Sequence, residues 1–398
     1  MLTLIELFDE CQIENVMAGL KLMPDKIVFV GHKKYMTPAR IAAVEKFFRN
    51  RSHNINFEYK TVGRYDFDSI YRELTDICIN NDRCTIDITG GKEIILAATG
   101  AVAHENHIPV VQFDVRNGRF IPVMNCETME DFPDVALNFE ESVMLNGGAV
   151  VRKGSDDFEW EFSQDFNSDL EIIWNICRQN CSLWNKNIGI LSAFEPQPFS
   201  GNSLEVTVSR KKLPDNYDFV KIFLDKGLLT DYYEDSDRIS FRYKNENVYR
   251  ALSKAGNILE LYTYMLLREI NLEDATFYDD ILTGVVVDWD GVVYKSFRYP
   301  ADTQNELDIV VMRGATPVFV SCKNGEVHKE ALYELDTVAD KFGGKYAKKA
   351  LVCTYVTFNE KAKTNLAGRA RDMKTELIHG VHSLTREEFK KLLKEKLR

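Results

Sequence analysis

Strand and helix patterns alternate through the first 145 residues, and this alternation constrains the fold more than any other feature of the chain. Short runs rich in β-branched and aromatic residues predict strands, which span residues 3–8, 26–30, 56–60, 84–88 and 108–115. The segments between them have helical periodicity and predict helices at residues 13–22, 38–49, 68–80 and 92–105. This order is typical of a parallel sheet with helices on both faces, so we predict an α/β, Rossmann-like domain over residues 1–145.

One turn of this domain combines the residue types of a phosphate-binding loop. Thr89, Gly90, Gly91 and Lys92 leave a buried strand and open a helix. Glycine permits close backbone approach, the first amides of a helix bind anions, and a hydroxyl and an ammonium add further donors. The spacing matches neither the Walker A loop nor G-x-G-x-x-G. A phosphate site and a tight turn without a ligand are therefore both open at this point.

Two amide side chains follow the first predicted strand. Gln12 and Asn15 would border the same crevice as this turn if the first and fourth strands are neighbours. Ligands bind at the carboxyl ends of parallel strands, at the point where the strand order reverses. We therefore add both residues to the candidate ligand site, on their position alone.

Two neighbouring strands predicted in the C-terminal half contain charged residues within apolar runs. The runs at 305–311 and 317–322 are rich in β-branched residues and flank a turn signal, so they predict a hairpin. Asp308 stands near the head of the first strand and Lys323 at the end of the second. Buried charges are costly unless they are paired or solvated, so such a pair indicates either a cross-strand ion pair or a site. The chemistry that suits it is metal-assisted phosphodiester cleavage, with Asp308 as a ligand and Lys323 offsetting charge on the phosphate.

A third candidate group comes from a helix. Glu260 lies in a segment of strong helical periodicity that begins near Gly256. A helix glutamate, a strand aspartate and a strand lysine, in this chain order, resemble the PD-(D/E)xK nuclease superfamily. The resemblance implies a restriction-endonuclease-like α/β/α domain over residues 251–398, with Glu260, Asp308 and Lys323 in its active site.

The chain departs from that superfamily at Ser321, two positions before the lysine, where the pattern has a carboxylate. Serine is a poorer ligand than a carboxylate for a hard cation, although we keep Ser321 in the predicted catalytic set. Glu306 is held in reserve as a further ligand. The expected cation, Mn²⁺ or Mg²⁺, would take its ligands from water, from two carboxylates and from one backbone carbonyl: Glu260, Asp308, and Val320 or Cys322.

Charge is unevenly distributed along the chain. The net charge is −11, yet the stretch from residue 344 to residue 398 has 14 Lys and Arg against 6 Asp and Glu. These basic residues, among them Lys345 and Lys349, could form a surface that faces phosphates near the hairpin. A solvated terminal helix explains the last lysines of the chain equally well.

The middle of the chain predicts a linker and a smaller domain. Residues 146–164 form a polar linker pattern, and residues 165–250 combine helices with a strand-like ribbon, which suggests a winged-helix-like insert. This insert has slightly more acidic than basic residues. Reading a DNA groove needs positive charge, so a spacer or dimer-contact role is favoured over DNA binding.

The combined order of these motifs resembles the CARF-domain nucleases of type III CRISPR immunity, and the resemblance covers essentially the whole chain. It rests on the turn from Thr89 to Lys92 and on the segments around Glu260, Asp308 and Lys323. It implies that residues 1–145 form a CARF domain that dimerises and binds a cyclic oligoadenylate, expected to be cyclic tetra-adenylate, across its two-fold axis. It further implies that the ring activates metal-dependent cleavage of single-stranded RNA and DNA, with nicking of duplex DNA as an additional activity.

Other functional classes are constrained by what the sequence lacks. It has no apolar run of membrane-spanning length and no signal-peptide pattern at its start, which predicts a cytoplasmic protein without a membrane partner. Its 8 cysteines form no C-x-x-C pair, which indicates reduced thiols. A HEPN-type ribonuclease needs R-x-x-x-x-H, and this motif is absent. A nucleotide-sensing transcription regulator with an inactive nuclease fold remains the alternative function.

Overall fold

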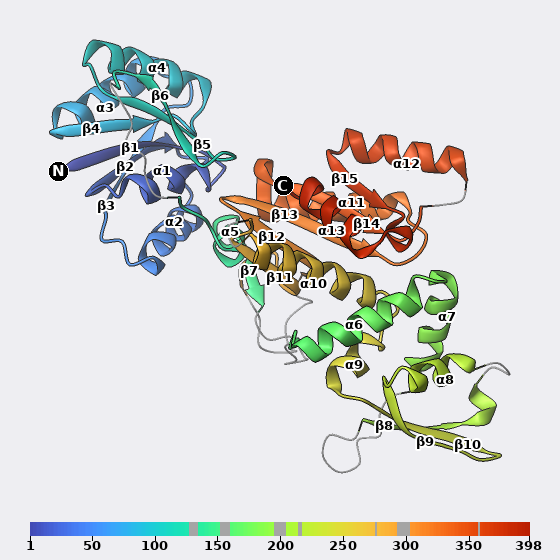
Figure 1. The fold of residues 1–398 in the computed structure, drawn as a ribbon. Helices are drawn as coiled ribbons and strands as arrows, with labels where there is room; N and C mark the ends of the chain where they lie inside the picture. The colour runs from blue at the N-terminus through green and yellow to red at the C-terminus, as the bar shows by residue number, and fades with distance from the viewer. Residues whose placement is uncertain are drawn as a thin grey trace.

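The computed structural model shows an α/β chain whose described residues form three sheets, arranged along the molecule as Figure 1 shows. Two six-stranded sheets belong to the N-terminal and C-terminal parts, and a three-stranded sheet lies at the far end from the N-terminus. No described helix has both the length and the apolar character needed to cross a bilayer. The structure describes residues 1–126, 134–151, 160–194, 204–213, 217–274, 277–292, 303–356 and 359–398.

The N-terminal sheet has the order β3-β2-β1-β4-β5-β6, and only its edge strand β6 runs antiparallel to its neighbour. Helices α1 and α2 pack on one face, around Phe29, and helices α3 and α4 pack on the other, around Val28. The predicted Rossmann-like alternation of strands and helices is therefore confirmed. Its strands are β1 Leu2–Phe8, β2 Lys26–His32, β3 Asn56–Val62, β4 Arg83–Asp87, β5 Val110–Asp114 and β6 Arg119–Met124. Its helices are α1 Glu14–Leu22, α2 Pro38–Asn50, α3 Phe67–Ile79 and α4 Glu93–Glu105.

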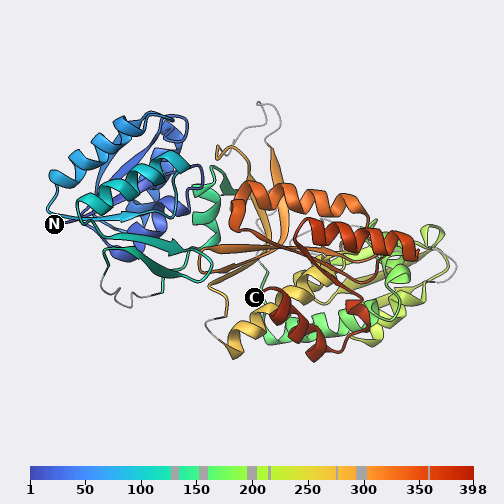
Figure 2. The same cartoon turned by 90° about the horizontal axis from the view of Figure 1, so that it is seen from above.

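The C-terminal sheet has the order β15-β14-β13-β12-β11-β7 and carries helices on both faces, as the view from above shows (Figure 2). Tyr262 of α10 and Phe389 of α13 pack on one face, whereas Leu332 of α11 and Leu366 of α12 pack on the other. The predicted α/β/α arrangement and its hairpin β12–β13 are both present. The strands are β7 Ala149–Val151, β11 Asp280–Asp288, β12 Gln304–Arg313, β13 Thr316–Lys323, β14 Lys348–Cys353 and β15 Thr375–His379. The helices are α10 Asn257–Glu273, α11 Lys329–Gly343, α12 Glu360–Asp372 and α13 Arg386–Lys396.

The segment that leaves the N-terminal part joins the C-terminal sheet directly. Helix α5 (Phe139–Leu145) packs beside α11, and strand β7 pairs antiparallel with β11. A Cβ at Gly148 would lie 2.7 Å from the Asp288 carbonyl oxygen and 2.5 Å from a Phe342 ring atom, so only glycine lets the chain pass here. The predicted linker at 146–164 therefore contains a sheet strand, and its residues 152–159 lie outside the described structure.

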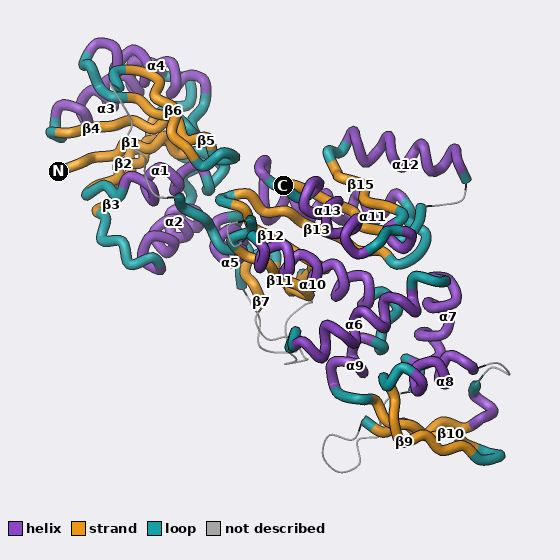
Figure 3. The backbone as a smooth tube through the Cα atoms, viewed as in Figure 1, coloured by secondary structure: helices purple, strands orange, loops and turns teal. Residues whose placement is uncertain are grey.

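The insert consists of helices around a three-stranded antiparallel sheet with the order β8-β10-β9 (Figure 3). The expected combination of helices with an antiparallel ribbon is present, and the winged-helix-like assignment of residues 165–250 stays a prediction. Helix α6 attaches the insert to α10, since the rings of Trp174 and Tyr262 stack with centroids 5.0 Å apart. Its strands are β8 Glu205–Ser209, β9 Leu229–Glu234 and β10 Arg238–Tyr243, and its helices are α6 Gln164–Cys177, α7 Cys181–Leu191, α8 Asp218–Asp225 and α9 Glu246–Ala251.

Candidate active site and ligand site

The hairpin β12–β13 brings three of the predicted catalytic residues together. The two strands pair from Arg313 opposite Thr316 to Ile309 opposite Val320. Asp308 is the next residue on β12 after the last of these pairs. Asp308 Oδ2 accepts hydrogen bonds from the Cys322 backbone N–H at 2.7 Å and from the Ser321 hydroxyl at 3.1 Å. Lys323 Nζ lies 3.8 Å from the same oxygen, and its side chain is 42% exposed. Ser321 therefore orients the aspartate, and Lys323 stays accessible to a substrate.

Glu260 reaches the same place from the first turn of α10. The Thr283 hydroxyl lies 2.9 Å from Glu260 Oε1 and 2.9 Å from the Asp308 backbone oxygen, so it connects the helix to β12. Gly284, next to Thr283 on β11, has φ +60°, and a Cβ there would lie 4.0 Å from Glu260 Oε1. The positive φ favours glycine at this position, and an isolated glycine within a strand pattern was the sequence signal for an irregular strand beside Glu260.

The electrostatics of Glu260 favour a cation. Burial raises the pKa of Glu260 to about 8, the charges of Asp308 and Glu306 add to the rise, and the Thr283 hydrogen bond opposes it. A buried carboxyl group beside a second carboxylate is destabilised when ionised, and a divalent cation between them relieves this cost. Glu306 itself is exposed.

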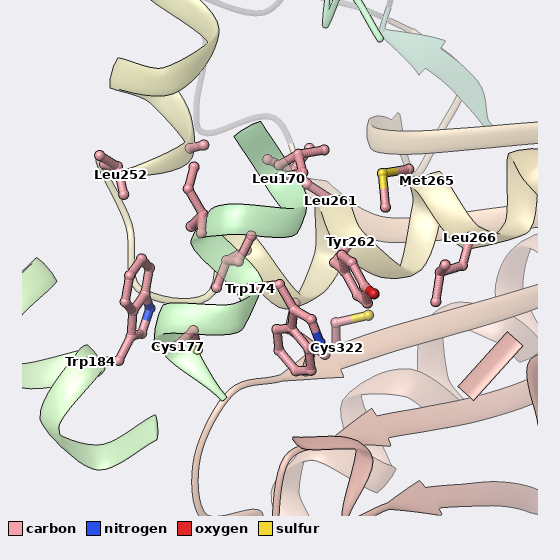
Figure 4. Packing of buried hydrophobic residues seen from close by; sticks show 14 of the residues in the cluster. Leu170, Trp174, Cys177, Trp184, Leu252, Leu261, Tyr262, Met265, Leu266 and Cys322 are labelled. Carbon is pink, nitrogen blue, oxygen red and sulfur yellow. The ribbon is translucent and has the colours of Figure 1, made fainter. Parts of the chain in front are cut away.

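Cys322 does not offer its thiol to this site. Its side chain is buried beside Tyr262 and Trp174, as Figure 4 shows, within the apolar cluster under α10. Burial raises the pKa of the Cys322 thiol well above its usual range, and the Asp308 and Glu260 charges raise it further. Its backbone N–H is already bound to Asp308. Of the groups of Cys322, the carbonyl oxygen is therefore the one that remains as a predicted metal ligand.

The donor set fits a hard cation that keeps part of its water shell. Among the residues that the structure describes, no group of three or more His, Cys, Asp and Glu side chains could hold a metal ion. Glu260 and Asp308 supply two carboxylates, and Ser321 takes the place of a third. Mg²⁺ is commonly held by one or two carboxylates together with waters and substrate phosphates, so two carboxylates are sufficient for this kind of ion.

We expect the affinity for Mn²⁺ to rise with pH through about 8. A carboxyl group with a raised pKa is protonated at neutral pH, so the cation must displace that proton and binding releases it. Calorimetric titration with Mn²⁺ between pH 6 and pH 9 measures the effect, and buffers of different ionisation enthalpy count the protons. In Glu260→Gln, binding should be weaker and should lose most of this pH dependence. Equal pH dependence in wild type and Glu260→Gln would contradict the assignment.

The predicted ligand site lies where the order of the N-terminal sheet reverses. Strands β1 and β4 are neighbours, and the turn after β4 meets the end of β1. A Cβ at Gly90 would lie 2.6 Å from the Leu7 carbonyl oxygen, and Gly91 has φ +93°, so both positions require glycine. Helix α4 begins directly after Lys92 without a side-chain cap. Its first amides are thus positioned for an anion.

Lys92 and Thr89 have partners that the sequence did not reveal. Lys92 Nζ lies 3.1 Å from both Asp9 Oδ1 and Glu10 Oε1, which follow β1. The Thr89 hydroxyl donates to Asp87 Oδ1 and accepts from the Phe113 N–H, both at 2.6 Å. These two hydrogen bonds therefore hold the turn against β4 and β5. The predicted contact of Thr89 with a ligand stays a prediction, and the hydroxyl could still accept one more hydrogen bond.

Gln12 and Asn15 shape the loop after β1. Asn15 is fully buried, accepts from the Asp9 N–H at 2.9 Å and donates to the Asp9 carbonyl at 3.0 Å. Gln12 donates to the same carbonyl at 3.1 Å, and its buried Oε1 has no hydrogen-bond partner within the described structure. Asn15 therefore holds the loop through the Asp9 backbone, and its predicted contact with a ligand stays a prediction. The contact predicted for Gln12 stays a prediction.

The same loop leads to a contact between the N-terminal and C-terminal parts of the chain. Glu14 of α1 is 2% exposed, and its Oε1 accepts from the Tyr346 hydroxyl at 2.5 Å. Lys345 Nζ lies 2.6 Å from the same oxygen. Lys349 pairs with Asp336 of α11. Two members of the predicted basic surface are therefore committed to internal ion pairs.

Comparisons with known proteins agree with both halves of the fold. Residues 245–398 match the family model described as the Card1-like endonuclease domain. Protein VC1899 from Vibrio cholerae superposes with a TM-score of 0.76 at 15% sequence identity, covering 99% of this chain and 97% of that one. Can2 from Sulfobacillus thermosulfidooxidans, solved in complex with cyclic tetra-adenylate, superposes with a TM-score of 0.70 at 15% identity, covering 100% of both chains.

A third solved structure is described as a type III CRISPR defence DNA nuclease activated by cyclic oligoadenylate. It gives a TM-score of 0.50 at 13% identity and covers 89% of this chain, which spans 45% of the length of that protein. A search of curated proteins found no match. At these identities the superpositions show a shared fold, whereas the family match shows an endonuclease domain.

Proposed function

We propose that this chain, a nuclease by virtue of its Card1-like endonuclease domain at residues 245–398, is switched on by a cyclic oligoadenylate in type III CRISPR defence. The ring we favour is cyclic tetra-adenylate, the substrates are single-stranded RNA and DNA, with nicking of duplex DNA as a further activity, and the active form is a cytoplasmic homodimer. One observation carries the cleavage part of the proposal. Thr283 joins the Glu260 carboxylate to the Asp308 backbone, the Asp308 charge raises the pKa of Glu260, and Lys323 Nζ lies 3.8 Å from Asp308 Oδ2.

Each residue of this site has a distinct role in the proposed cleavage. Glu260 and Asp308 would hold Mg²⁺ or Mn²⁺, which supplies Lewis acidity and a more acidic bound water when it is present. Ser321 keeps the Asp308 carboxylate oriented through its hydroxyl. Lys323 is exposed enough to meet a phosphate oxygen, and its positive charge would offset the negative charge that develops during cleavage.

The N-terminal domain supplies the proposed sensor. Cyclic tetra-adenylate is the ligand of Can2, whose fold this chain shares along its whole length. Here the glycine turn, the uncapped start of α4 and Lys92 would meet the phosphates of the ring. A ring with an even repeat matches a two-fold dimer, because each subunit then presents the same residues to half of it.

The contact of Glu14 with Lys345 and Tyr346 offers a route between the two sites. Glu14 follows the loop that holds Asp9 and Glu10, the partners of Lys92. A phosphate that draws Lys92 away from these carboxylates would shift the loop and, with it, the buried Glu14. Its partners Lys345 and Tyr346 belong to the C-terminal part, beside the start of β14.

The double variant Lys345→Ala, Tyr346→Phe is expected to reduce ring-dependent activation by about 5–150-fold, the usual range of coupling between sites. Ring binding should persist, since neither residue lies in the glycine turn. The measurement is the ratio of cleavage rates with and without saturating ring, beside ring affinity by calorimetry. Lys46→Ala, an exposed lysine on α2, serves as the control and should leave the ratio unchanged. An unaltered ratio in the double variant would remove this route.

The proposed function is tested by incubating the pure protein with end-labelled single-stranded RNA, single-stranded DNA or supercoiled DNA in Mn²⁺ or Mg²⁺. Cyclic tri-, tetra- and hexa-adenylate are added separately, beside a linear tetra-adenylate control. We expect cleavage that depends on one of the rings and on the metal. Ring binding without cleavage under any condition would instead support the nucleotide-sensing regulator, and equal cleavage with and without every ring would remove the sensor.

A further inference from the structure

The residue after Lys323 links the active-site strand to the insert and to the catalytic helix. Asn324 Nδ2 lies 3.2 Å from the Ala255 carbonyl oxygen, 3.2 Å from Asn185 Oδ1 and 3.3 Å from Cys177 Sγ. These acceptors come from the segment before α10, from α7 and from α6. Because all three neighbours are acceptors, the NH₂ group of the Asn324 amide, and not its oxygen, must face them.

Asn185 of α7 fastens the same loop from the other side. Its Nδ2 donates to the Asn324 backbone oxygen at 2.7 Å, so the two asparagines form a reciprocal pair. Gly325 follows with φ +144°, and a Cβ there would lie 3.3 Å from Asn185 Nδ2. The Gly325 N–H donates to the Thr354 hydroxyl at 2.9 Å, at the end of β14. The chain just beyond Lys323 is therefore held on both sides.

The Ala255 peptide connects this loop to Glu260. Ala255 lies two residues before the start of α10, whose first turn carries Glu260. Its carbonyl oxygen also accepts from Trp184 Nε1 of α7, at 3.1 Å. One peptide group is thus bound by Asn324 from the hairpin and by Trp184 from the insert. The spacing between Lys323 and the helix of Glu260 depends on these bonds.

We propose that Asn324 is a positioning residue for phosphodiester cleavage, and that α7 of the insert completes the active site by holding it through Asn185. The inference rests on the cleavage site proposed above and gives the insert a role other than DNA reading. The buried Asn324 amide binds groups that no apolar side chain of similar size would satisfy. Its loss would let the end of β13 and the start of α10 move independently, and Glu260 and Lys323 would lose their mutual alignment.

The test compares two variants, Asn324→Ala and Asn185→Ala. Asn187→Ala is the matched control, because Asn187 lies on α7 like Asn185. Both test variants are expected to lower kcat by about 10–100-fold, the usual cost of losing a group that orients ligands, with KM for the nucleic acid within about twofold. Cyclic tetra-adenylate affinity should be unchanged in all three. Asn324→Asp, which keeps the size but places a carboxylate against three acceptors, should be at least as impaired as Asn324→Ala.

A second readout does not depend on cleavage. Because Asn324 aligns the helix that carries Glu260, both test variants should bind Mn²⁺ about 10-fold more weakly than wild type by calorimetry, while Asn187→Ala binds it normally. Thermal melting identifies any variant that fails to fold, and Asn185→Ala, which leaves the Asn324 side chain in place, then decides the question. Wild-type kcat and Mn²⁺ affinity in folded Asn185→Ala would overturn the inference. Absence of cleavage in wild type would instead refute the proposed function and leave the Mn²⁺ comparison to decide this one.

Discussion

Asp308→Asn is expected to lower the cleavage rate of the ring-activated protein by about a thousandfold, the largest effect of any single substitution considered. A metal ion contributes several kcal/mol to stabilising the charge of the transition state, and each 1.4 kcal/mol is about a factor of ten in rate. Asparagine is the same size, and its Oδ1 can still accept from the Cys322 N–H. The fold and ring binding should therefore persist, so the loss would report chemistry.

Single-turnover cleavage with saturating ring measures this effect, and calorimetry with Mn²⁺ should show a parallel loss of metal affinity. Glu330→Gln, which removes an exposed carboxylate from α11, is the control and should retain nearly full activity. The reserve ligand can be assessed in the same experiment through Glu306→Gln. If Asp308→Asn cleaves within about tenfold of wild type, a metal held by Asp308 is not the source of the activity.

Lys92→Met is expected to raise the concentration of ring needed for half-maximal activation by about 10–100-fold, with the maximal rate preserved. A hydrogen bond between charged groups contributes about 1.5–3 kcal/mol, and methionine keeps the length of the side chain without its charge. In the free protein Lys92 is bound to Asp9 and Glu10, and the ring phosphates must compete with these carboxylates. This competition makes the measured effect smaller than the full value of a phosphate contact.

The measurement is a titration of cleavage rate against cyclic tetra-adenylate, beside direct ring binding. Lys46→Met, an exposed lysine on α2, is the matched control and should leave the titration unchanged. Because Lys92 also pairs with Asp9, thermal melting of the variant distinguishes a disturbed loop from a lost ligand contact. A variant of normal stability that responds to the ring like wild type would exclude Lys92 from the sensor.

The parts of the fold that local patterns control were predictable from sequence. Alternation of strands and helices predicted the N-terminal sheet, and the apolar runs around Asp308 and Lys323 predicted the hairpin β12–β13. Strand β7 was not predicted, since three residues carry no periodicity and its pairing with β11 joins segments far apart in sequence. The linker pattern at 146–164 reflected the two glycines before β7, of which Gly147 has φ +77° and Gly148 packs closely against Phe342.

The residues of the candidate site also fall into those that local sequence patterns predict and those that depend on contacts between distant segments. Asp308, Ser321 and Lys323 lie on adjoining strands of one hairpin, so their proximity follows from local structure. Thr283, which connects Glu260 to β12, depends on the position of β11 and was missed. The hydrogen bonds of Asn15 to the Asp9 backbone were not foreseen, because sequence position does not show whether an amide faces a ligand or its own loop.

The most direct test of the central claim is to locate the cation. Crystals grown with Mn²⁺ and a ring, measured at a wavelength where manganese scatters anomalously, show where the ion binds. The account predicts an anomalous peak bonded to carboxylate oxygens of both Glu260 and Asp308, beside Lys323, and its loss in Asp308→Asn. A protein that cleaves nucleic acid in Mn²⁺ but shows no peak between these two carboxylates, or shows one elsewhere, would contradict it.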